Sequence, residues 1–164
     1  MPRGAYSYRP TRTPFIHASV DDDSRAKVGG TVVQFKAAVA LKLGDCVFLS
    51  AADTVSKSVT TGDHVSVVGI VVGGANTNDE VVDDSTLYGV STAADIDEDV
   101  LVLISGIAYV IPDATDAAGS LIIPDDATTA GQVEAGTTAT KIIGMLLATP
   151  TAIGAPTRAL IFRA

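Results

Sequence analysis

The chain has no tryptophan, only four tyrosines and four phenylalanines, and a single cysteine among its 164 residues. Because 47% of the residues are nonetheless hydrophobic, the core must be filled by valine, isoleucine, leucine and alanine, a composition that suits β structure. Cys46 lies in an apolar run and has no partner cysteine, which excludes a disulfide framework and a cysteine metal site. We expect Cys46 to be a buried, unreactive thiol.

Long hydrophobic runs are also missing. The longest apolar stretches, 100–111 and 65–72, are shorter than the roughly 18 to 20 residues that a membrane-spanning helix needs. The first residues lack the apolar core of a secretion signal. We therefore expect a soluble protein that is made in a cytoplasm and has no membrane partner.

Positive charge is scarce and unevenly placed. The net charge is -8, yet the first twenty residues contain three arginines and no acid. A charge of +3 there leaves -11 on the rest of the chain. An acidic body repels phosphates, and three cations are too few for the multiple phosphate contacts that drive nucleic-acid binding. DNA and RNA are therefore not expected as partners.

The basic segment, residues 1–28, is predicted to be an extended N-terminal arm. Its first fifteen residues include three prolines and show no helical periodicity, and proline disfavours helix in the residue before it. Tyrosine and arginine are enriched where proteins bind each other. The predicted partner-binding residues are therefore Arg3, Tyr6, Tyr8, Arg9, Arg12 and Phe15. The alternative is an unstructured terminus without a role.

What the chain has in abundance is a repeated β pattern. The run Gly44-Asp45-Cys46-Val47-Phe48-Leu49 is followed by Val68-Gly69-Ile70-Val71-Val72, and 75 positions later Gly119-Ser120-Leu121-Ile122-Ile123 is followed by Ile143-Gly144-Met145-Leu146-Leu147. Each second glycine comes 25 residues after the first. The spacing indicates a duplicated unit of short strands and turns, although chance self-similarity within a β protein rich in valine, alanine and glycine is the alternative.

The predicted fold is all-β, a small β-barrel or β-sandwich built from two related β units behind the extended arm. The body covers residues 29–164, with unit one at about 29–106 and unit two at about 107–164. Unit one contains an insertion at 73–99. Strands bounded by turn residues are expected at 32–36, 46–49, 65–72, 100–104, 107–111, 121–123, 141–147 and 159–163.

Motifs for catalysis are lacking. The sequence has two histidines, His17 and His64, but no Gly-x-Ser-x-Gly motif that would supply a serine nucleophile. Neither a phosphate-binding glycine loop nor a metalloprotease motif occurs. We expect no enzyme activity and no cofactor.

Three acidic clusters, 21–23, 79–84 and 95–99, offer the oxygen ligands that hard cations take, but none matches a calcium-binding loop. Asp97 and Asp99 are the best of these candidates. Solvated loop charge is the favoured interpretation, so no metal ligand is predicted.

The order of three segments resembles a known family. Leu43-Gly44-Asp45-Cys46-Val47-Phe48-Leu49-Ser50, then Val68-Gly69-Ile70-Val71, then the run from Val100 to Val110 are similar to the capsid cement or head decoration proteins of tailed bacteriophages. The resemblance implies a β-rich body on the outside of an assembled head, commonly a trimer and sometimes a dimer. The long arm and the insertion depart from a minimal member of the family.

The expected function is therefore that of a structural virion protein on the outer capsid surface. It would bind the major capsid protein, bridge neighbouring subunits and act as a homo-oligomer, most simply a trimer. The alternative is a carbohydrate-binding or adhesive β module of a fibre or cell surface. Such modules stack sugars on exposed aromatic rings, for which the body offers only Tyr88 and Tyr109.

Overall fold

The computed structural model describes residues 15–16, 28–58, 66–125 and 129–162, and of 15–16 only the backbone. Within these ranges the chain is all-β, with short 3-10 turns and no α-helix. No described helix has the length and hydropathy to cross a membrane. The strands are β1 (Phe15–Ile16), β2 (Gly29–Ala37), β3 (Leu41–Lys42), β4 (Cys46–Ala51), β5 (Thr54–Lys57), β6 (Val67–Gly74), β7 (Thr92–Ala94), β8 (Asp99–Val110), β9 (Leu121–Pro124), β10 (Val133–Ala135), β11 (Gly144–Leu146) and β12 (Thr157–Ile161).

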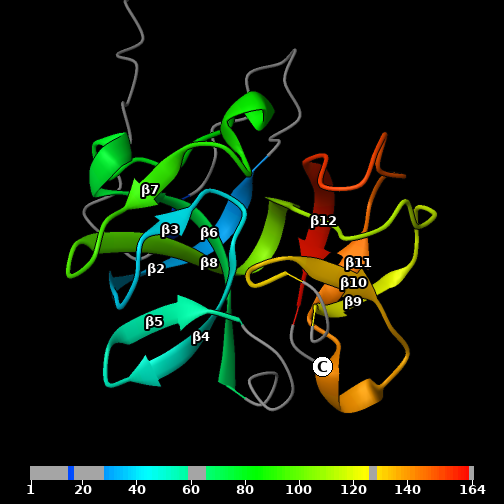
Figure 1. Cartoon of the computed structure of the whole chain (residues 1–164), viewed down its shortest axis with the longest axis horizontal. Coiled ribbons are helices and arrows are strands. Elements are labelled where there is room, and N and C mark those ends of the chain that lie inside the picture. Colours follow the sequence, from blue (N-terminus) through cyan, green and yellow to red (C-terminus); the bar gives the residue numbers. More distant parts are fainter. Residues whose placement is uncertain (1–14, 17–27, 59–65, 126–128, 163–164) are drawn as a thin grey trace, which may run out of the picture.

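Ten of the strands form one sheet in the order β1-β2-β5-β4-β6-β8-β12-β11-β9-β10, and β3 pairs separately with β7. An additional pairing joins β2 to β8. The strands β2, β5, β4, β6 and β8 therefore close into a ring, a small barrel that we call barrel one. In Figure 1 its strands occupy the left side of the molecule.

A second ring begins on the same long strand. The C-terminal half of β8 pairs with β12, which continues through β11 and β9 to β10. A parallel bridge between Val133 of β10 and Pro112, just after the end of β8, closes the ring. This second ring, barrel two, lies beside the first in Figure 1, and β8 belongs to both.

The two barrels have the same strand register. A pair of facing residues in barrel one has a counterpart in barrel two, and the first residue of the pair lies 75 positions later there. Val47 faces Gly69 as Ile122 faces Gly144, and Phe48 faces Ser56 as Ile123 faces Glu134. Val71 faces Val102 as Leu146 faces Ala159, and Val33 faces Val102 as Ala108 faces Ala159. Even the bridge between Pro112 and Val133 repeats the parallel pair of Ala37 with Val55.

Glycines at matching positions have matching environments. A Cβ atom at Gly69 would collide with the carbonyl oxygen of Leu103, and one at Gly144 with that of Leu160. These two strands approach their neighbours so closely that only a residue without a side chain fits. The registers agree with the predicted repeat, and we retain the division into unit one and unit two as a proposal.

The core is aliphatic, as the composition predicts. Its fully buried residues are mainly valine, leucine, isoleucine and alanine from β4, β6 and β8, together with Cys46. Burial raises the pKa of the Cys46 thiol, because the charged thiolate cannot be solvated there. The prediction of a buried, unreactive cysteine is consistent with this position.

The units contact each other through a turn of unit two. Gly131, between β9 and β10, accepts a hydrogen bond from the amide of Cys46 at 2.8 Å and donates one to the carbonyl of Ser58 at 2.9 Å. The neighbouring Asp45 is buried, accepts from the amide of Lys42 at 2.8 Å and lies 3.4 Å from the Lys57 ammonium. Backbone hydrogen bonds thus join the turn to barrel one, and the Asp45 side chain packs closely against Gly131.

Two expectations about strands are wrong. The runs 100–104 and 107–111 are one continuous strand, β8, because Gly106 stays in the ladder opposite Gly30 instead of forming a turn. The segment 141–147 is a strand only from Gly144, since Lys141 ends a 3-10 turn, η4 (Ala139–Lys141). The insertion 73–99 contains η2 (Ala75–Thr77), η3 (Ser85–Leu87) and β7.

We expect Gly69→Ala and Gly144→Ala to lower the free energy of unfolding by similar amounts, about 1 to 3 kcal/mol each, because the added methyl group forces the adjacent backbone to move. Equilibrium urea unfolding measures both losses. Gly154→Asn is the control, since Gly154 has open space around it and a φ of 76° that asparagine tolerates. A loss at only one of the two positions would contradict their equivalence.

Candidate functional site

Most of the predicted partner-binding residues lie outside the described part of the chain. This holds for Arg3, Tyr6, Tyr8, Arg9 and Arg12. The backbone of Phe15 is described: it forms β1 with Ile16 and pairs antiparallel with Thr31 of β2. The middle of the predicted arm is thus paired with β2 of barrel one, and the binding role of the six residues stays a prediction.

The residues weighed for catalysis and cation binding are not brought together where the structure describes them. His17, His64 and the cluster 21–23 lie outside the described ranges. Asp99 forms an ion pair with Lys36 at 2.6 Å, and the hydrogen bond from this ammonium lowers the pKa of the carboxyl. Asp97 belongs to the turn before β8, with a φ of 64°.

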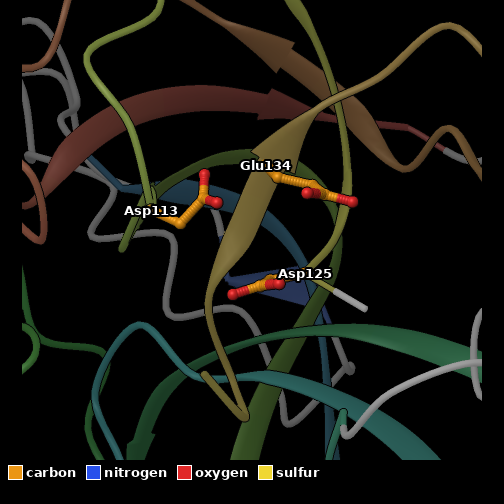
Figure 2. A group of neighbouring side chains, drawn as sticks. All are labelled: Asp113, Asp125 and Glu134. Atoms are coloured by element: carbon orange, nitrogen blue, oxygen red, sulfur yellow. The ribbon is translucent and has the colours of Figure 1, made fainter. Parts of the chain in front are cut away.

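The structure gathers a different set of acids, which sequence reasoning missed. Asp113 follows β8, Asp125 follows β9 and Glu134 lies in β10. One carboxylate oxygen of each lies within 4.8 Å of the others. Figure 2 shows the three side chains and the chain segments from which they project. We call this set the acidic trio; among the described residues it is the one group of acidic, histidine or cysteine ligands that meets this distance.

The environment of the acidic trio is partly closed to water. Asp125 is 2% exposed and accepts a hydrogen bond from the amide of Thr129 at 2.9 Å. Atom Oδ1 of Asp113 is buried without a hydrogen-bond partner. Burial first, and then the charges of Asp125 and Asp116, raise the pKa of Asp113. Crowded oxygens of this type suit a hard cation, and without one their charges repel.

The acidic trio is a feature of unit two alone. The register of the repeat places Ala38, Ser50 and Ser56 at the corresponding positions of unit one. Because none of these carries a charge, the same barrel can be built without the acids. The trio therefore carries a cost that the fold itself does not require.

A pocket of about 410 Å³ lies where the two units meet. One wall comes from residues 85–90 of the insertion, and the opposite wall from residues 151–156, the equivalent connection of unit two. Ile111 and Gln132 complete the lining. We call this site the junction pocket. No lysine or arginine lines it.

Both tyrosines of the body are buried. Tyr88 is 1% and Tyr109 7% exposed, and their rings pack with centroids 5.2 Å apart. The Tyr88 hydroxyl donates to the carbonyl of Val82 at 2.7 Å. These rings are the ones that the carbohydrate-binding alternative would need at the surface, so the structure removes its main support.

Comparisons with known proteins find similar solved structures but no related sequence. No family profile matches the chain, and no curated protein matches it in sequence. The crystal structure of the head fiber gp8.5 N base of bacteriophage phi29 matches with a TM-score of 0.48 and 12% identity over 81% of this chain and 94% of that one. A likeness at this level supports no conclusion about function.

Replacing the charge of Asp113 should stabilise the protein. Its raised pKa means that the ionised carboxyl lowers the free energy of unfolding at neutral pH, and that this cost is relieved as the pH falls through the raised pKa toward the ordinary value. We expect Asp113→Asn to raise the melting midpoint at pH 7 by about 2 to 4 °C, the shift of about 1 kcal/mol in a chain of this size.

The same variant should lose part of the gain that the parent shows on acidification. Thermal melts between pH 4 and pH 8, all with a chelator to remove divalent ions, measure both effects. Glu80→Gln, at an exposed position outside the trio, is the matched control and should change little. A lower midpoint for Asp113→Asn at neutral pH would show that the charge is balanced by a contact.

Proposed function

We propose that the chain is a structural virion protein that binds the outer surface of an assembled phage head and bridges neighbouring major capsid subunits. The observation that carries the proposal is the placement of the three segments that resemble cement and decoration proteins. They are strands β4, β6 and β8, which are consecutive neighbours in barrel one. The resemblance therefore follows one contiguous part of the fold rather than scattered glycines.

The architecture supports a mechanical role. The body is two closed β rings joined by a common strand, and its charged Lys36 and Asp99 lie at the surface. A rigid body with a basic N-terminal arm suits a protein that holds subunits together, since bridging needs two separate binding surfaces and no catalytic site. Several weak contacts to one lattice raise the total affinity by orders of magnitude.

A closed homo-oligomer, most simply a trimer, is part of the proposal. A ring of copies multiplies the number of arms that act together on one shell, and cyclic symmetry is the common solution for identical subunits. Sedimentation equilibrium at tens of micromolar would detect it. If the protein is a monomer at all concentrations, the homo-oligomer does not form in solution and could form only on the shell.

Removing residues 1–14 should separate folding from attachment. This truncation keeps β1 on β2 and all of the barrels, so the melting midpoint should stay nearly unchanged. Tyrosine and arginine anchors can each contribute about 2 kcal/mol at a buried contact. Because several arms act together, we expect binding to heads to weaken at least about a hundredfold.

The assay is co-sedimentation of the full-length and truncated proteins with stripped heads at matched salt. The double variant Tyr8→Ala with Arg9→Ala should reproduce part of the loss. Ile96→Ala, at an exposed position on the insertion, is the control for unspecific effects. Equal occupancy by the full-length and truncated proteins would assign attachment to the body.

A further inference from the structure

The junction pocket has an apolar, exposed rim. Val90 and Ile153 are 72% and 71% exposed, the highest values among the large hydrophobic residues of the described chain, and Leu87 is 39% exposed. Val90 lines the pocket, and Leu87 and Ile153 adjoin lining residues. Exposed apolar residues around a hollow of this size mark a recognition surface.

The pocket is already formed without a ligand. Tyr88 on its wall is fixed by the hydrogen bond to Val82 and by its packing on Tyr109. Tyr88 and Ile111 also pack against Gly44, where a Cβ would come within 3.2 Å of the tyrosine ring. A hollow of about 410 Å³ is too small for a folded element but accommodates one or two aromatic side chains.

The charges next to the pocket in the chain are negative. Asp83 and Asp84 immediately precede the lining residue Ser85, and Asp113 comes two residues after Ile111. The pocket therefore fits a segment that offers an aromatic or apolar side chain together with positive charge. Residues 1–14 of this chain have that composition, with two tyrosines, three arginines and no acid.

The direction of β1 argues that this segment comes from another copy. Phe15 pairs with Thr31 and Ile16 with Gly30, so β1, followed from Ile16 to Phe15, points toward Val32 and the end of β2 at Lys36. The pocket lies at the opposite end, because β8 passes Gly29 at Ile107 and ends at Val110, next to the lining residue Ile111. Fourteen extended residues reach about 46 to 50 Å, far enough to cross to a neighbour.

We propose that the junction pocket binds residues 1–14 of a second copy of this chain, with an arm tyrosine in the hollow and an arm arginine facing Asp83 and Asp84. In a closed ring one tyrosine and one arginine of each arm contact the pocket of the next copy, a head-to-tail contact that fills every pocket, and the other tyrosine and arginines of the arm stay available for the shell. This deepens the proposed function, because it names the contact that links copies to one another, and its test needs no head.

The test is disulfide trapping between two different variants. Cys46 is fully buried, so an introduced cysteine is the reactive thiol. A tagged Tyr8→Cys protein is mixed with untagged Val90→Cys protein and oxidised, and the covalent dimer of the two is quantified by mass. Ile96→Cys replaces Val90→Cys in the matched control, because Ile96 is 61% exposed and belongs to the turn next to the end of β2.

We expect at least tenfold more mixed dimer with Val90→Cys than with Ile96→Cys. In proteins without an introduced cysteine, Val90→Lys should lower the oligomer mass in sedimentation and leave the melting midpoint unchanged. Ile96→Lys should leave the oligomer mass unchanged. Equal yields with both partners would overturn the proposal. So would a bond that forms only within one chain of the double variant Tyr8→Cys with Val90→Cys, which would assign the pocket to its own arm.

The result separates the two proposals. Trapping between copies without co-sedimentation with heads would support the pocket and refute the attachment to a shell. Co-sedimentation with equal trapping at Val90 and Ile96 would support attachment and refute the pocket.

Discussion

The close contact of Gly30 with Gly106 is the constraint on which the double barrel depends. These residues face each other where β8 leaves barrel one and enters barrel two. A Cβ at Gly30 would lie 2.7 Å from the Cα of Gly106, and a Cβ at Gly106 would lie 2.7 Å from the Cα of Gly30. The register of β2 against β8 shifts next to this point, between Thr31 and Val32. Two bare backbones let one strand change partners without ending.

The all-β fold was predicted from the sequence, and the proposed repeat was the clearest pattern in it, because glycines in tight turns and crowded strands leave a local signal. The spacing from Gly44 to Gly69 and from Gly119 to Gly144 corresponds to equivalent positions in the two rings. Short strands such as β3, β5, β7 and β10 were missed, since two to four residues carry too little periodicity. The break expected at Gly106 was wrong because its conformation is decided by a distant residue, Gly30.

The candidate sites depended even more on distant pairing. Asp113, Asp125 and Glu134 have no motif spacing in the sequence, and only the pairing of β9 with β10 and the bridge to Pro112 bring them together. A comparison of the two units could have identified them, since uncharged residues stand at all three positions of unit one. The arm, by contrast, was visible in composition alone. Its role is proposed on that composition and on the charge and shape of the junction pocket.

Sharing β8 also affects how the chain can reach its native state. Barrel one closes only when β2 finds a strand about seventy positions away in sequence, and barrel two is built on the remaining half of that strand. Contacts of such separation are slow to form because a long loop must be ordered first. Whichever barrel forms first supplies the other with an edge strand. A chain that looks like two modules therefore cannot be divided at the repeat boundary, because a cut there would leave each half with part of β8.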